Sequence, residues 1–150
     1  MARVVAHLPD LLFGSKVQGM LAAAGHDVHV AGTPQAALEH LTGADLLVLD
    51  LCEDSAGRLA ILADVLATTR TLAFYLHTDV DTRTAALAAG CDLVVPRSRM
   101  AREGAALADG LLAADVSAQL ARRARQGGGR SDDRSRRSLG RVRRGDDESA

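Results

Sequence analysis

A carboxylate, Asp50, stands at the end of the apolar run ADLLVLDL, residues 44–51. His7, His77 and Arg97 likewise stand at or just after the ends of other short apolar runs. Imidazoles together with a carboxylate could transfer protons or bind a transition metal, and a guanidinium pairs well with anionic oxygens. Whether these side chains can act together depends on the elements that position them.

The apolar runs alternate with stretches of helical spacing. Five Val- and Leu-rich runs are typical of buried strands: Arg3–His7, Asp27–Ala31, Leu46–Leu51, Leu72–His77 and Leu93–Val95. Five Ala- and Leu-rich stretches are predicted as helices: Leu11–Ala24, Pro34–Leu41, Ala56–Ala67, Thr82–Ala89 and Arg102–Leu120. This alternation predicts an α/β fold with a five-stranded parallel, doubly wound sheet of the flavodoxin-like order 2-1-3-4-5.

Helix ends are marked in the sequence. Three glycines are predicted to end helical runs in a left-handed conformation: Gly25, Gly43 and Gly90. Thr33 before Pro34 is a candidate N-cap, the stretch Thr78–Asp81 has the pattern of a capping box, and Ser98 is a candidate N-cap for the last helix.

Parallel sheets of this order bring the carboxyl ends of neighbouring strands to one crevice. We therefore expect His7, Asp50, His77 and the turn around Arg97 to converge, with a hydrogen bond between His7 and Asp50. A transition-metal site across His7, Asp50 and His77 is the alternative. A dinucleotide site is not expected, because no Gly-rich loop follows the first strand.

The charge is uneven along the chain. Residues 1–120 carry 8 basic and 14 acidic side chains, a balance of −6, whereas residues 121–150 carry 10 arginines and 5 acids, a balance of +5. We predict one domain over residues 1–120 and a disordered Arg-, Gly- and Ser-rich tail over residues 121–150. The tail is either a solvated linker or a weak contact for anions or nucleic acid. With 2% aromatic residues, a base-stacking surface is not expected.

Two cysteines, Cys52 and Cys91, form neither a disulfide framework nor a zinc-ligand pattern. No segment reaches the roughly 20 apolar residues that a membrane span requires. These features predict a cytoplasmic protein without membrane contact.

Two stretches, LLVLDL and AALAAGCDLVVPRS, resemble a response-regulator receiver domain of the CheY-like superfamily, over residues 3 to about 115. The resemblance implies that Asp50 is the phospho-acceptor and that the carbonyl of Cys52 is a Mg²⁺ ligand. It also implies an acidic pair after the first strand, a hydroxyl after the fourth and a lysine after the fifth.

The sequence departs from that pattern at each of these supporting positions. His7 and Leu8 stand for the acidic pair with Asp10 displaced, Tyr75 or Leu76 stands for the hydroxyl with Thr78 displaced, and Pro96 or Arg97 stands for the lysine. Lys16 is the only lysine in the chain. The remaining candidates are Asp10 and Asp50 for Mg²⁺, and Arg97 and Thr78 for phosphate, with His7, Asp10, Tyr75 and His77 around the crevice.

These departures favour a degenerate receiver, or pseudo-receiver, that acts in bacterial signal transduction without enzymatic activity or a cofactor. Its partner would be a protein bound by the last two helices, or a second copy of the chain. One alternative is an active single-domain response regulator in a phosphorelay, phosphorylated at Asp50 with Mg²⁺. The other is a small enzyme that uses the crevice of His7, Asp50 and His77. The ratio of 17 arginines to one lysine fits a high-GC genome.

Overall fold

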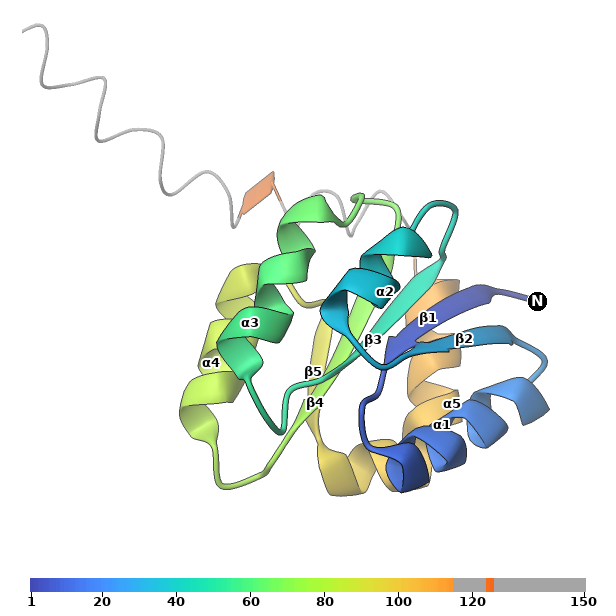
Figure 1. Cartoon of the computed structure of the whole chain (residues 1–150), viewed down its shortest axis with the longest axis horizontal. Coiled ribbons are helices and arrows are strands. Elements are labelled where there is room, and N and C mark those ends of the chain that lie inside the picture. The colour runs from blue at the N-terminus through green and yellow to red at the C-terminus, as the bar shows by residue number, and fades with distance from the viewer. Residues whose placement is uncertain (115–123, 126–150) are drawn as a thin grey trace, which may run out of the picture.

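The computed structural model describes residues 1–114 and 124–125, so the predictions for residues 115–123 and 126–150, which include most of the disordered tail, lie outside the described residues. The five strands are parallel and lie in the order β2-β1-β3-β4-β5, which confirms the predicted order 2-1-3-4-5 (Figure 1). Their bounds are Arg3–His7 for β1, Asp27–Ala31 for β2, Leu46–Asp50 for β3, Arg70–Tyr75 for β4 and Leu93–Pro96 for β5.

Helices cover both faces of this sheet, with α1 and α5 side by side on one face and α2, α3 and α4 on the other (Figure 1). Their bounds are Leu11–Ala23 for α1, Pro34–Glu39 for α2, Ser55–Leu59 for α3, Val80–Ala89 for α4 and Arg97–Ala113 for α5, with a 3₁₀ helix, η1, over Ala60–Asp64. No helix in the described part of the chain is long and apolar enough to cross a membrane.

The core consists of two layers because strand side chains alternate between the faces of the sheet. In β3, Leu46 and Val48 pack with α1 and α5, whereas Leu47 and Leu49 pack with α2, η1 and α4. All four are fully buried. The continuous apolar run that ends at Asp50 is thus explained by a central strand covered on both faces.

Several predicted helix ends are confirmed. Gly90 ends α4 with φ of 102°, and Gly25 follows the C-cap of α1 with φ of 92°, a conformation that side chains with a Cβ rarely adopt. Gly43 also has a positive φ, but α2 ends at Glu39 with His40 as its C-cap, so the prediction that Gly43 ends this helix is wrong. At the start of α2, the Thr33 hydroxyl accepts a hydrogen bond from the backbone N–H of Ala36, with Pro34 in the first helical turn.

Other predicted boundaries are wrong. β4 ends at Tyr75, two residues before the predicted end, and α4 is capped by Asp79, whose carboxylate accepts from the N–H of Thr82 at 3.1 Å. α5 begins at Arg97, five residues before the predicted start, with Pro96 as N-cap, so Ser98 lies inside the first turn and is not the cap. Proline has a fixed φ suited to the start of a helix, which allows the chain to pass directly from β5 into α5.

The predicted helix Ala56–Ala67 is shorter and divided in the structure. α3 ends at Leu59, and η1 continues it as a 3₁₀ helix only to Asp64. Val65 is then extended, with φ of −85° and ψ of 127°. β-branched residues have lower helix propensity than alanine or leucine, which agrees with an end at this point.

Candidate functional site

A cavity of about 460 Å³ opens at the carboxyl ends of β1 and β3, beside the first residues of α1 and α5. We call it the Asp50 cavity. It is lined by Pro9, Asp10, Leu11, Leu12, Asp50, Cys52, Glu53, Arg58 and Arg97. Three carboxylates and two guanidinium groups therefore meet where α/β sheets of this order place their sites.

Asp50 is paired with Arg58, a residue of α3 that the sequence analysis did not identify. Nη1 of Arg58 donates to the carbonyl oxygen of Asp50 at 2.7 Å and lies 3.7 Å from its Oδ1. Oδ1 also accepts from the backbone N–H of Cys52 at 2.9 Å. Both residues of the pair are less than 9% exposed. An arginine in an otherwise apolar helical stretch, a few residues after a buried acid, was the signal that could have identified it.

His7 lies at the end of β1 and is buried. Its Nδ1 lies 3.0 Å from the carbonyl oxygen of Ala31, which can only accept, so Nδ1 carries the proton. Nε2 has no hydrogen-bond partner in the described structure, so the predicted hydrogen bond between His7 and Asp50 is wrong. Burial lowers the pKa of His7, and the nearby guanidinium of Arg58 lowers it further.

Asp10 and Arg97 lie at the solvent-exposed edge of the Asp50 cavity. Asp10 is the N-cap of α1, because its Oδ1 accepts from the N–H of Phe13 at 3.0 Å. Its Oδ2 lies 3.4 Å from Nη2 of Arg97, and both side chains are nearly half exposed. The guanidinium of Arg97 also lies 4.3 Å from the centre of the Phe13 ring. The structure thus brings Asp10, Asp50 and Arg97 into one cavity.

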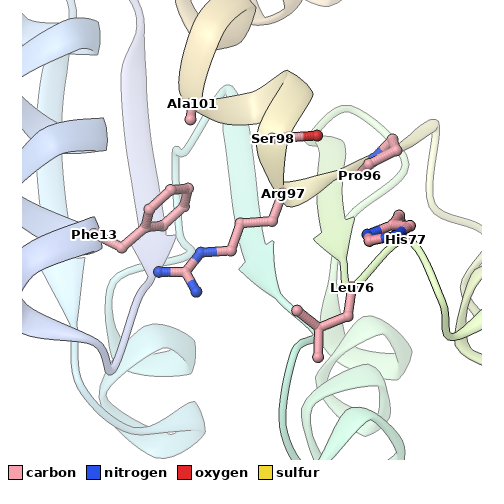
Figure 2. A pocket seen from close by; sticks show the side chains of 7 residues that line it. All are labelled: Phe13, Leu76, His77, Pro96, Arg97, Ser98 and Ala101. Atoms are coloured by element: carbon pink, nitrogen blue, oxygen red, sulfur yellow. The ribbon is translucent and has the colours of Figure 1, made fainter.

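The remaining predicted site residues lie elsewhere. Tyr75 is buried in the layer beneath α2 and α4, and His77 and Thr78 are exposed in the loop between β4 and α4. His77 lines a second cavity, which we call the apolar cavity (Figure 2). The structure does not bring His7, Asp50 and His77 together, because β4 ends at Tyr75 and the chain turns away before His77.

The donor set in the Asp50 cavity does not fit Mg²⁺, which requires oxygen ligands in octahedral geometry. Arg58 lies against the Asp50 carboxylate, and Asp10 caps α1 and contacts Arg97. His7 is buried at the end of β1 and supplies a nitrogen, not an oxygen, ligand. Among residues 1–114 and 124–125, no group of three His, Cys, Asp or Glu side chains could hold a metal ion.

The thiol of Cys52 lies beside the Asp50 carboxylate. Burial, together with the hydrogen bond and negative charge of Asp50, raises the pKa of Cys52 to about 12. A thiol with so high a pKa is neutral at physiological pH and a poor nucleophile. Cysteine chemistry therefore adds nothing to this site.

Comparison with known proteins finds similar structures but no similar sequence. No protein-family model matches the sequence, and no curated protein matches it significantly. A response regulator from Thermotoga maritima superposes with a TM-score of 0.66 at 16% identity, over 76% of this chain and 99% of that one. A response regulator receiver domain protein from Clostridium thermocellum superposes with a TM-score of 0.65 at 14% identity, over 75% of this chain and 94% of that one. The BeF3-activated DrrB receiver domain superposes with a TM-score of 0.66 at 18% identity, over 75% of this chain and 97% of that one. The described part of this chain therefore has the fold of a response-regulator receiver domain.

Proposed function

We propose that the chain is a receiver-like signalling module that acts through protein contacts and does not carry out Mg²⁺-dependent phosphoryl transfer. One observation carries the proposal: Arg58, a cation of the protein itself, is fixed against both the carbonyl oxygen and the carboxylate of Asp50. The acceptor is thus neutralised by a buried side chain, where a working receiver would use a metal ion.

Phosphoryl transfer depends mainly on positioning and on neutralising charge. A phosphoryl group on Asp50 would add negative charge to a cavity that Asp10 and Glu53 also line. Arg58 already uses Nη1 on the Asp50 carbonyl, and Arg97 is paired with Asp10. The unfavourable charge of the product argues against efficient phosphorylation.

An active receiver phosphorylated at Asp50 is the second candidate. It is favoured by one feature, the presence of two guanidinium groups, Arg58 and Arg97, in the same cavity as Asp50. Guanidinium groups bind phosphate oxygens well and could replace the missing lysine. The small enzyme based on His7, Asp50 and His77 receives no such support, since those side chains lie apart.

We further propose a protein partner at the surface of α4 and α5. Val80, the first residue of α4, is 63% exposed, which provides an apolar contact there. A second copy of the chain, and anion or nucleic-acid contact by residues 121–150, are the other proposed interactions. Neither Cys52 nor Cys91 forms a disulfide within the described residues, which fits the reducing conditions of a cytoplasm.

The test is amide NMR of the full chain with Mg²⁺, and then with Mg²⁺, beryllium and fluoride, with Asp50→Asn as the control. We expect the wild-type spectrum to change no more than that of Asp50→Asn. Saturable shifts at Asp50, Cys52 and Arg97 that are absent from the variant would support the active receiver instead. Incubation with acetyl phosphate and Mg²⁺, followed by intact mass measurement, gives an independent answer.

A further inference from the structure

The apolar cavity shares Arg97 with the Asp50 cavity. It has a volume of about 310 Å³ and is lined by Phe13, Leu76, His77, Pro96, Arg97, Ser98 and Ala101. Figure 2 shows Phe13 of α1 on one side and Leu76 and His77 of the β4–α4 loop on the other, with the side chain of Arg97 extending between them. Leu76 is 44% exposed, so the cavity can be reached from solvent.

Two kinds of surface meet in the apolar cavity. Phe13, Leu76, Pro96 and Ala101 provide apolar walls, whereas the polar groups are the guanidinium of Arg97, the imidazole of His77 and the hydroxyl of Ser98. No carboxylate lines it. The Asp50 cavity, in contrast, contains Asp10, Asp50 and Glu53, and Arg97 lines both cavities. An anion is therefore favoured in the apolar cavity over the Asp50 cavity, where three carboxylates face two guanidinium groups.

Arg97 is available for a ligand at low cost. Its ion pair with Asp10 is long, at 3.4 Å, and nearly half exposed on both sides, so solvent screens it. The cation–π contact with the Phe13 ring orients the guanidinium of Arg97 and leaves its N–H groups available for hydrogen bonds. A ligand oxygen in the cavity could thus replace Asp10 as the partner of Arg97.

The size and donor set restrict the ligand. A volume of about 310 Å³ is at the lower end of the range for small-molecule sites, so the ligand is small. One guanidinium forms two parallel hydrogen bonds with one carboxylate, whereas a phosphate has more charge to neutralise and calls for further donors. The apolar walls require a hydrocarbon body.

We propose that the apolar cavity binds a small organic carboxylate with an aliphatic body, whose carboxylate pairs with Arg97 and whose chain packs against Phe13 and Leu76. Because Arg97 also contacts Asp10, the bound ligand changes that contact and so reaches the edge of the Asp50 cavity. The site does not depend on whether Asp50 can be phosphorylated, so it goes beyond the proposed function.

The test is an amide NMR titration of the full chain with octanoate as the probe. We expect saturable shifts at Leu76, His77, Ser98 and Ala101 at millimolar concentrations. Acetate lacks the apolar body, 1-octanol lacks the charge and inorganic phosphate lacks both the body and the planar carboxylate. Each should bind about tenfold more weakly or not at all.

Two variants on α5 form a matched pair for this titration. Arg97→Gln should weaken octanoate binding about tenfold or more, whereas Arg99→Gln should leave it unchanged, because Arg99 pairs with Glu103 on the exposed side of the helix and does not line the cavity. Arg97→Lys keeps the charge without the planar fork and should be intermediate. Circular dichroism checks that each variant is folded.

Four results would overturn the proposal: no saturable shift with octanoate, equal binding of octanoate and 1-octanol, tighter binding of phosphate, or unchanged affinity in Arg97→Gln. The response to beryllofluoride is measured without octanoate. Failure of the ligand site and failure of the proposed function are therefore separate outcomes.

Discussion

Replacement of Arg58 by methionine should destabilise the fold more than replacement of its partner Asp50 by asparagine. Arg58→Met removes the donor to the buried Asp50 carbonyl and leaves the carboxylate without its cation. Asp50→Asn keeps the carbonyl bonded to Arg58 and keeps an oxygen for the N–H of Cys52. The two variants thus differ in how many buried groups lose their partners.

The contacts give the size of this effect. A hydrogen bond from a charged donor contributes about 1.5 to 3 kcal/mol, and the one from Arg58 to the Asp50 carbonyl is short, at 2.7 Å. Coulomb's law for the 3.7 Å pair, with an effective dielectric constant of about 20, gives a gross attraction of about 4 kcal/mol, much of which desolvation offsets. We expect a net loss of about 3 kcal/mol for Arg58→Met and about 1 kcal/mol for Asp50→Asn.

Urea unfolding of the full chain, followed by circular dichroism, measures both losses. The control is Arg99→Met, which breaks a pair with Glu103 that is nearly half exposed and should cost less than about 0.5 kcal/mol. In the double variant of Asp50 and Arg58, the loss should be smaller than the sum of the single losses by about 1 kcal/mol. A loss below 1 kcal/mol for Arg58→Met, or a larger loss for Asp50→Asn, would refute the reasoning.

Three further predictions concern single residues. The pKa of His7 is lowered from 6.5 in the folded state, so the unfolded state binds the proton more readily. The free energy of unfolding should therefore decrease as the pH falls below about 6.5, by up to about 1.4 kcal/mol per pH unit. In urea unfolding at pH 7.5 and 5.5, His7→Asn should lose this dependence on pH. Because the pKa of Cys52 is about 12 in the folded protein, its thiol should react with iodoacetamide at pH 8 about a thousandfold more slowly than the same thiol in the urea-unfolded protein. Peptide mapping measures both rates. Gly90→Ala should cost about 1 to 2 kcal/mol in thermal unfolding because φ is 102°, whereas Gly110→Ala, in open space on α5, should be neutral or stabilising.

The fold could be predicted because local signals and global topology agree in this sequence. β1 and β2 have the predicted bounds, since each is a short apolar run between polar turns. The errors lie where a boundary depends on one residue. α5 begins at Arg97 within the polar stretch RSRMARE, which shows little apolar periodicity, so only the packing of Met100 against the sheet reveals that turn as helical.

The site was less predictable than the fold. Asp50 and Arg97 could be placed at one cavity from topology alone, because strand ends and helix starts are fixed by the sheet order. The position of Arg58 in an otherwise apolar stretch could have marked it as a candidate, but its pairing with Asp50 depends on side-chain directions that no periodicity encodes. His77 was misplaced for a related reason: an error of two residues in the end of β4 moves a side chain from one cavity to another.

Arg58 and Arg97 differ in the free energy needed to displace them from their partners, and this difference bears on where the proposed ligand could act. A metal ion or phosphoryl group at Asp50 would compete with Arg58, whose removal leaves buried groups unpaired at a cost of about 3 kcal/mol. A carboxylate at Arg97 displaces only an exposed ion pair with Asp10, which contributes less than about 1 kcal/mol. A ligand can shift an equilibrium between two conformations only by the difference in its affinity for them. A weakly bound ligand is therefore sufficient to displace Arg97 from Asp10 but not to displace Arg58 from Asp50. The proposed carboxylate site would thus give this fold a responsive position at the carboxyl edge of the sheet, at the start of α5 and separate from Asp50.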